Sequence, residues 1–232
     1  MSGGTIRLSK EDILHIRSLR LRPSERFTVC DGEGRDHICR LGDRGEGIAE
    51  VVETRPSRGE PSVECRVYIA IAKGDRLDFA VQKSVELGAF KIVLFHSERC
   101  VAAPDNMTNK IARLKRIALE TAKQSGRGRV PEVTAAGSFR SAVLEAAQAD
   151  MPLFCYEEES KRGLKEALDS RGGFNTASIV TGPEGGFEPA EARLATESGM
   201  IPVSLGPRIL RCETAPAAAL AALMFHTDNM IL

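Results

Sequence analysis

Short apolar runs alternate with amphipathic stretches over most of this chain. The runs expected to form strands are Cys65–Ile71, Lys91–Phe95, the region around Val133, Leu153–Tyr156, Ser178–Thr181 and Ile201–Leu205. The stretches with helical spacing are Asp75–Leu87, Thr108–Gln124, Phe139–Ala149, Pro189–Ser198 and Ala215–Phe225. Strands separated by helices need long crossover connections, so the pattern predicts an α/β fold with a parallel sheet covered by helices.

The first 60 or so residues have a different pattern, with short strand candidates and turn-forming tracts. The expected strands are Arg26–Cys30, His37–Leu41 and Gly47–Glu53, and the tract Asp31–Gly34 is a turn. This part predicts a small β module. The Pro-, Gly- and Ser-containing stretch Thr54–Pro61 is interpreted as a domain boundary or, alternatively, as the tip of a long hairpin.

The predicted helix Thr108–Gln124 separates apolar from basic positions. Met107, Ile111, Leu114 and Ala118 recur at helical spacing and should form its buried stripe. Residues 105–131 carry a net charge of +5, whereas residues 132–200 contain twelve acids against six basic residues. The basic segment is either a surface for phosphate or an ordinary solvated face.

The composition removes several classes of function. The chain has 232 residues and zero formal net charge, which allows a sizeable core and excludes a uniformly basic coat for nucleic acid. The longest apolar run, Ala215–Phe225, is shorter than the roughly 18 residues that a membrane span needs. The N-terminus lacks the pattern of a secretion signal, so a cytoplasmic protein is expected. The six cysteines and four histidines lack metal-ligand spacing, which predicts reduced thiols and no metal.

A glycine-rich tract follows the expected strand Ser178–Thr181. It reads Gly182-Pro183-Glu184-Gly185-Gly186-Phe187 and leads into a helix with Pro189 in its first turn. Glycines allow bare backbone to approach a ligand, although a plain connection between strand and helix would look similar. The spacing matches neither a dinucleotide-binding motif nor a phosphate-binding P-loop.

A second tract of the same kind, Leu205–Thr214, follows the expected strand Ile201–Leu205. We expect the two strands to be neighbours, so that both tracts lie at the carboxyl edge of the sheet, where parallel sheets bind ligands. Their Gly, Pro and Leu content suits a flat, neutral, adenosine-like group. The alternative is that Thr214 only caps the next helix and Leu210 belongs to the core.

These two tracts resemble the motifs of the bacterial 16S ribosomal RNA uridine N3-methyltransferases, a family of the SPOUT class. Further stretches agree with that family in the same order: Asp31–Gly34, Lys73 with Gln82–Gly88, Ser97–Arg99, and Glu120–Ser125 with Arg127 and Pro131. The resemblance covers nearly the whole chain. Two departures are the missing aromatic residue in Thr5–Leu8 and the missing tryptophan before Glu120. The first leaves an RNA contact by Arg7 unsupported.

The resemblance implies a PUA-like RNA-binding β-barrel over residues 1–66 and a SPOUT methyltransferase domain over residues 67–232. It also implies a trefoil knot that binds the cofactor at about residues 178–226, although threaded chains are nearly absent among proteins in general. The implied activity is methylation of N3 of a specific uridine in 16S ribosomal RNA of the small ribosomal subunit. The implied cofactor is S-adenosylmethionine and the implied assembly is a homodimer, with neither membrane nor metal.

Each implied role falls on particular residues. Cofactor contacts are expected at Gly182, Pro183, Glu184, Gly185, Gly186, Leu205, Gly206, Ile209, Leu210 and Thr214. RNA contacts are expected at Arg17, Arg20, Arg22, Arg26, Lys73, Lys83, Arg99, Gln124 and Arg127. Arg211 is the candidate for stabilising negative charge on the uracil ring. Glu213 or Glu184 could accept the N3 proton, or either could hold a loop.

Two other functions remain open from the sequence. A ribose 2′-O-methyltransferase of the same fold class would share the cofactor pocket, and a non-catalytic RNA-binding assembly factor would lack cofactor binding. We expect Gly185→Arg to abolish cofactor binding in a folded protein. We also expect Arg127→Glu to weaken RNA binding and change its salt dependence.

Overall fold

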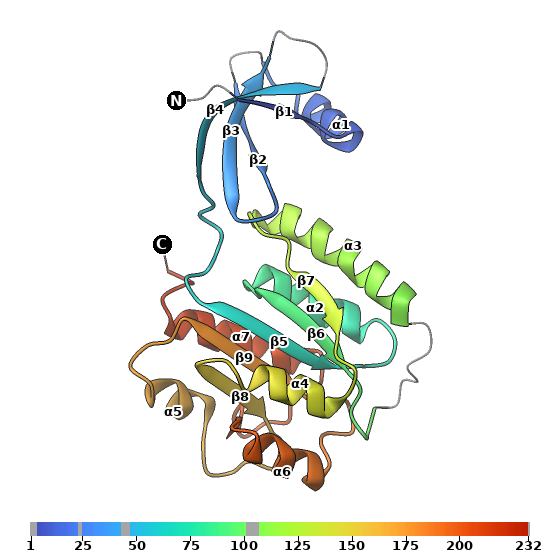
Figure 1. Ribbon diagram of the computed structural model, residues 1–232, viewed down its shortest axis with the longest axis vertical. Coiled ribbons are helices and arrows are strands. Elements are labelled where there is room, and N and C mark those ends of the chain that lie inside the picture. The colour runs from blue at the N-terminus through green and yellow to red at the C-terminus, as the bar shows by residue number, and fades with distance from the viewer. Residues whose placement is uncertain (1–3, 23–24, 43–46, 101–106, 232) are drawn as a thin grey trace. The chain divides into compact units, whose positions relative to one another are not determined.

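The computed structural model describes residues 4–22, 25–42, 47–100 and 107–231 (Figure 1). The chain divides into two compact units. Unit 1 comprises Met1–Glu60 with the short segment Arg127–Arg129, and unit 2 comprises Pro61–Gly126 with Val130–Leu232. The predicted change of pattern near residue 61 therefore coincides with a change of unit, and the stretch before it is partly strand.

Unit 1 is built on an antiparallel sheet with the strand order β1-β4-β3-β2. The strands are β1 (Thr5–Arg7), β2 (Arg26–Cys30), β3 (Arg35–Leu41) and β4 (Ile48–Pro56). The sheet has a small core in which Leu8, Cys39 and Ala49 are buried. Partly buried apolar side chains such as Phe27 and Val51 pack against these three residues.

Helix α1 (Lys10–Leu19) also belongs to unit 1 and was missed by the sequence prediction, which treated this region as β-like. The Ser9 hydroxyl accepts a hydrogen bond from the amide of Asp12, whose carboxylate in turn accepts one from the Ser9 amide. This capping box satisfies amide groups that the first turn leaves unpaired. The pattern Ser-x-x-Asp was therefore a usable signal for the start of α1.

Unit 2 contains a six-stranded parallel sheet with the order β10-β8-β9-β5-β6-β7. Its strands are β5 (Glu64–Ala70), β6 (Lys91–Phe95), β7 (Glu132–Ala135), β8 (Met151–Cys155), β9 (Thr176–Thr181) and β10 (Ile201–Val203). Its helices are α2 (Arg76–Glu86), α3 (Met107–Ser125), α4 (Phe139–Ala146), α5 (Leu164–Asp169), α6 (Pro189–Glu197) and α7 (Thr214–His226).

Helices cover both faces of this sheet, as Figure 1 shows. Alternate residues of β5 point to opposite sides: Val67 and Ile69 pack with α2, α3, α5 and α7, whereas Tyr68 and Ala70 pack with α4 and α6. Burial on both faces explains why these strands appear in the sequence as continuous apolar runs.

The sequence located every strand and all helices of unit 2 except the six-residue α5, with boundaries within a few residues. Leu114 and Ala118 of the predicted α3 stripe are fully buried, and Met107 and Ile111 pack against the same core. One expectation is wrong: β9 and β10 are not neighbours, because β8 lies between them. Strands adjacent in sequence need not pair when a later strand returns to the far edge of the sheet.

Candidate active site

A cavity of about 460 Å³ lies at the carboxyl ends of β8, β9 and β10 in unit 2. The segments that follow these strands line it: Cys155–Glu157, Thr181–Gly186, Val203–Gly206 and Arg208–Glu213, together with Arg76 and Ala215. The carboxyl ends of parallel strands are the usual place for a ligand in such sheets. Because β8 lies between the other two strands, a third loop joins the two that the sequence identified.

The glycine turn after β9 is anchored by Phe187, whose side chain is buried beneath it. The Phe187 ring packs against Phe154 with centroids 4.5 Å apart and against Phe139 with centroids 5.6 Å apart. A Cβ atom on Gly182 would lie 3.0 Å from the Phe187 ring. The turn can therefore sit close to the aromatic cluster only because residue 182 has no side chain.

Glu184 in this turn is held by the loop that follows β5. Its Oε1 accepts hydrogen bonds from the Lys73 amide at 3.1 Å and from Nη1 of Arg76 at 3.0 Å. Burial alone would raise the pKa of Glu184, but hydrogen bonds from backbone amides and from Arg76 outweigh it, so this pKa lies below its usual value. The ionised carboxylate thus fixes the position of the turn.

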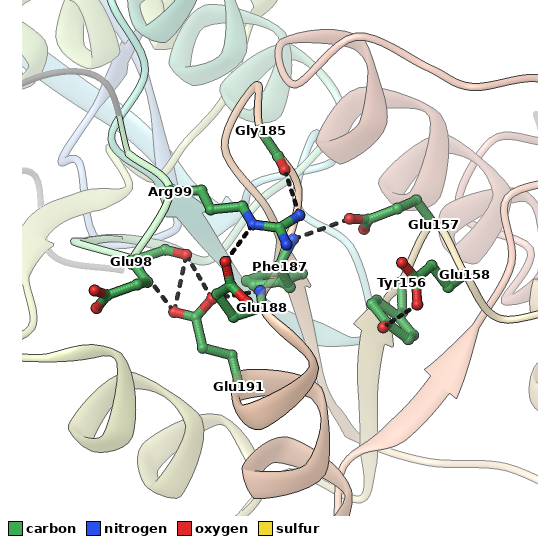
Figure 2. Close-up of polar contacts among 10 residues, drawn as sticks. Glu98, Arg99, Tyr156, Glu157, Glu158, Gly185, Phe187, Glu188 and Glu191 are labelled. Carbon is green, nitrogen blue, oxygen red and sulfur yellow. Dashed lines mark hydrogen bonds and ion pairs between the residues drawn. The ribbon is translucent and has the colours of Figure 1, made fainter.

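Loops after two further strands hold the other side of the turn (Figure 2). Nε of Arg99 donates to Glu188 at 2.6 Å, and Nη1 of Arg99 donates to the carbonyl of Gly185 at 3.1 Å. Oε1 of Glu157 accepts from the Phe187 amide at 2.9 Å. The glycine turn is therefore bonded to the segments that follow β5, β6 and β8.

The second predicted tract forms the opposite wall of the cavity. Arg211 is exposed, and its carbonyl accepts hydrogen bonds from the amides of Thr214 and Ala215 at the start of α7. The Cys212 thiol donates to Oε2 of Glu213 at 3.3 Å. Burial, with the Glu213 carboxylate as a further cause, raises the pKa of Cys212 to about 12, so this thiol stays protonated at neutral pH.

Nearly all the residues assigned to the cofactor and to catalysis line this one cavity. The exception is Thr214, which lies at the first position of α7 and does not line it. The sequence missed Arg76, Tyr156 and Glu157, which also line the cavity. The segment after β8 has no glycine-rich motif that would indicate a ligand site in the sequence. It reaches the cavity because β8 lies beside β9 in the sheet.

The residues assigned to RNA are spread over both units and differ in exposure. Those that are exposed are Arg17, Arg20, Arg22, Arg26, Lys73, Arg99 and Gln124. Lys83 is half-buried and pairs with Glu86 at 2.8 Å. Arg127 differs from all of these, because its side chain is only 3% exposed and its guanidinium forms two hydrogen bonds to Glu60, at 3.0 and 2.7 Å. This geometry favours a structural role for Arg127 within unit 1.

Comparison with known proteins agrees with this architecture. Residues 59–224 match the family model of an RNA methyltransferase domain, and residues 8–54 match that of an RNA methyltransferase PUA domain. The ribosomal RNA small subunit methyltransferase E of Bacillus subtilis is 33% identical over 97% of this chain and 91% of its own length. The chain belongs to the ribosomal RNA small subunit methyltransferase E family.

Solved structures of methyltransferases extend the match to three dimensions. The enzyme of Neisseria gonorrhoeae, solved bound to S-adenosyl methionine, has 34% identity and a TM-score of 0.79 over 97% of this chain and 93% of its own. A methyltransferase of Legionella pneumophila in complex with the same cofactor has 27% identity and a TM-score of 0.78. The predicted family and its α/β fold class with a small N-terminal β domain are confirmed.

The cavity of this methyltransferase E relative fits an adenosine-containing cofactor. Its volume lies within the range typical of small-molecule sites. In the described chain, the amides of Arg208, Ile209 and Leu210 donate no intramolecular hydrogen bond, which leaves them for solvent or a ligand. Gly206, with φ of +109° and open space beside its Cα, adds no side chain to that wall. Among the described residues, no helix is both long and apolar enough to cross a membrane.

Proposed function

We propose that this protein transfers the methyl group of S-adenosylmethionine to N3 of a specific uridine in 16S ribosomal RNA. The observation that carries the proposal is the cavity made by the glycine turn after β9 and the loop after β10. Membership of a family with a relative solved in complex with S-adenosyl methionine supports the cofactor. The relatives are ribosomal RNA small subunit methyltransferases, which supports the substrate.

When bound, S-adenosylmethionine supplies a methyl group already activated by the positive charge on sulfur. The protein then has to align the uridine N3 with that methyl group and keep water away, and it needs no strong acid for this. The loops Gly182–Gly186 and Leu205–Leu210 would hold the cofactor, chiefly through backbone groups. Substitution at carbon exchanges one bond for another: a bond from N3 to the methyl carbon forms and the sulfur bond to it breaks.

N3 of uridine carries a proton that must leave before or during the transfer. We assign stabilisation of the negative charge on the uracil oxygens to Arg211, which is exposed at the cavity wall. Of the two carboxylates considered, Glu213 is the better proton acceptor. Within the part of the chain that the structure describes, its carboxylate accepts a hydrogen bond only from the Cys212 thiol, whereas the Glu184 carboxylate already binds an amide and a guanidinium.

RNA contacts would involve both units. In unit 1 the exposed arginines of α1 and of the segment up to β2 supply positive charge: Arg17, Arg20, Arg22 and Arg26. In unit 2 the exposed face of α3, including Lys115 and Arg116, does the same. Lys73 and Gln124, which belong to the motifs of the family, are also exposed in unit 2. Phosphate contacts of this kind position an RNA without reading its sequence. The target uridine must be unpaired or extruded, because N3 is buried in a base pair.

The assembly and its setting are part of the proposal. Helix α7 is apolar on almost all sides, yet Phe225 is 68% exposed and Ala222 is also exposed. A helix that is apolar all round is normally buried, which supports a homodimer that covers α7.

We assign residues of about 178–226 to a knotted cofactor-binding region, residues 1–66 to RNA binding and residues 67–232 to methyl transfer. The proposed setting is the cytoplasmic small ribosomal subunit.

The decisive experiment is methyl transfer from labelled S-adenosylmethionine to small subunits isolated from cells that lack this protein, followed by mapping of the product. The expected product is one N3-methyluridine in 16S ribosomal RNA. A methyl group on a ribose 2′ oxygen would instead establish the 2′-O-methyltransferase. Failure of the purified protein to bind the cofactor by calorimetry would favour an assembly factor without catalytic activity.

A further inference from the structure

We propose that Arg99 is a positioning residue for cofactor binding, which holds the glycine turn in its binding shape and does not contact RNA phosphate. The sequence motif Ser97-Glu98-Arg99 would then serve the cofactor site from outside the cavity. Arg99 itself does not line the cavity, so its effect must pass through the turn that it holds. This inference rests on the proposed function, since the ligand of the turn is taken to be S-adenosylmethionine.

The contacts of Arg99 join the glycine turn to the residue that precedes α6. One nitrogen of its guanidinium donates to Glu188, which precedes Pro189 at the start of α6, and another donates to the Gly185 carbonyl. A planar guanidinium can bond two fixed acceptors at once, which an ammonium group on a flexible stem cannot do equally well. The turn and the start of α6 are therefore joined through one side chain.

Glu191, in the first turn of α6, strengthens the same connection. Its carboxylate accepts hydrogen bonds from the Ser97 hydroxyl at 2.9 Å, from the Glu98 amide at 3.1 Å and from the Glu188 amide at 2.9 Å. Ser97 is buried. The segment that carries Arg99 is thus hydrogen-bonded to α6, and these bonds hold the Arg99 guanidinium next to the turn (Figure 2).

Gly185 of the turn lies close to the backbone of Arg99. A Cβ atom on Gly185 would lie 3.0 Å from Cβ of Arg99 and 3.3 Å from its carbonyl oxygen. Because Gly185 has no side chain, Arg99 can approach closely enough to donate a hydrogen bond to the Gly185 carbonyl. Gly185 and Gly186 both line the cavity, so a shift of this carbonyl would move the cavity wall.

The charges around Arg99 disfavour a phosphate. Its guanidinium faces Glu157 as well as Glu188, with Glu158 close by (Figure 2). The hydrogen bond to Glu188 and the surrounding carboxylates raise the pKa of Arg99 above its usual value. An RNA phosphate placed here would meet three carboxylates and would have to displace Glu188. The acidic surroundings suit a structural pair and not an anion site.

The test compares Arg99→Gln and Arg99→Lys with Arg140→Gln, which changes an exposed arginine on α4 away from these contacts. Cofactor affinity is measured by calorimetry, and RNA affinity is measured as a function of salt. We expect Arg99→Gln to weaken S-adenosylmethionine binding by roughly threefold to tenfold, because an exposed ion pair and the hydrogen bond to the Gly185 carbonyl are both lost. The KM for the cofactor should rise while kcat at saturating cofactor changes little, and the salt dependence of RNA binding should not change.

Arg99→Lys should recover part of the affinity, and Arg140→Gln should behave like the unchanged protein. Glu188→Gln gives an independent check that keeps Arg99 in place, and we expect it to weaken cofactor binding in the same direction. Unchanged cofactor affinity in folded Arg99→Gln and folded Glu188→Gln would overturn the proposal. A reduced salt dependence of RNA binding in Arg99→Gln would also overturn it. If the unchanged protein does not bind S-adenosylmethionine, the proposed function fails and this inference fails with it.

Discussion

Gly186 shows how much of the site depends on a single residue without a side chain. Its φ is +70°, and a Cβ atom there would lie 1.8 Å from Oε1 of Glu157. The Glu157 side chain could move away, but it would then lose its hydrogen bond to the Phe187 amide. The conformation and the close approach act together, so only glycine is compatible with this turn.

We expect Gly186→Ala to weaken S-adenosylmethionine binding by at least about tenfold, because strain at positive φ of about 1–2 kcal/mol adds to the displacement of Glu157. Calorimetry on the folded variant measures this. The matched control is Gly199→Ala, since Gly199 has φ of +96° but open space beside it and does not line the cavity. Equal cofactor affinity in the two variants would show that the contact with Glu157 is unimportant.

Arg127 leads to a prediction about stability, in place of the RNA contact that the sequence indicated. Its buried guanidinium pairs with Glu60 through two hydrogen bonds. We expect Arg127→Met to lower the free energy of unfolding by about 3 kcal/mol, because the mostly buried carboxylate of Glu60 would lose its cationic partner and keep the hydrogen bond from the Arg129 amide. Urea unfolding of the full chain measures the loss.

The double variant Arg127→Met, Glu60→Gln removes both charges and should restore part of the stability. A loss in the double variant as large as in Arg127→Met would mean that the charge pair is not the cause. The salt dependence of RNA binding should be the same in the unchanged protein and in Arg127→Met. A lower salt dependence would return Arg127 to the list of phosphate contacts.

At the scale of elements, helix α3 combines a buried stripe with an exposed basic face. Leu114 and Ala118 are fully buried, whereas Lys115 and Arg116 are exposed. The apolar spacing predicted the first property. Charge alone left open whether the second is a phosphate surface or a solvated face, and the structure adds that these two side chains are accessible.

The double variant Lys115→Ala, Arg116→Ala tests that face of α3. If both side chains contact phosphate, the slope of log affinity against log salt should fall by about 1.4, which corresponds to roughly 0.7 per contact with single-stranded RNA. The control is Lys161→Ala, Arg162→Ala, an exposed basic pair outside the basic segment. Equal slopes for the two double variants would identify the α3 face as merely solvated.

For the whole molecule, zero net charge conceals a basic middle segment and an acidic segment after residue 131. This distribution provides local positive charge without strong, indiscriminate attraction to RNA. Selectivity should then come from the shape of the RNA site and from the assembly that presents the cavity. The oligomeric state is therefore the property to test at this scale.

We expect the protein to be a homodimer at micromolar concentration and Phe225→Glu to convert it to a monomer, because a charge on exposed α7 could not be buried in an interface. Size-exclusion chromatography with light scattering measures the mass. Leu144→Glu, at an apolar residue on α4 that is 47% exposed, is the control and should leave the dimer intact. A dimer in both variants would place any interface away from Phe225.

The sequence by itself determined the α/β class, most elements, the glycine turn and the second loop of the cavity, because each of these depends on local patterns. Apolar runs predict buried strands, and glycine and proline mark tight turns wherever the chain folds. Even the missed helix α1 carried a local capping signal in Ser9 and Asp12. The family resemblance rested on the same local tracts.

Only the tertiary structure decided which distant segments meet. Strand order inserted β8 between β9 and β10 and thereby brought Glu157 to the cavity. Tertiary packing also paired Arg127 with Glu60 and placed Arg99 against the glycine turn. These contacts change the interpretation of both arginines. Residue type and spacing record what a side chain can bind. Which partner it binds depends on contacts between residues far apart in the chain, and these arise only when the sheet and its helices pack.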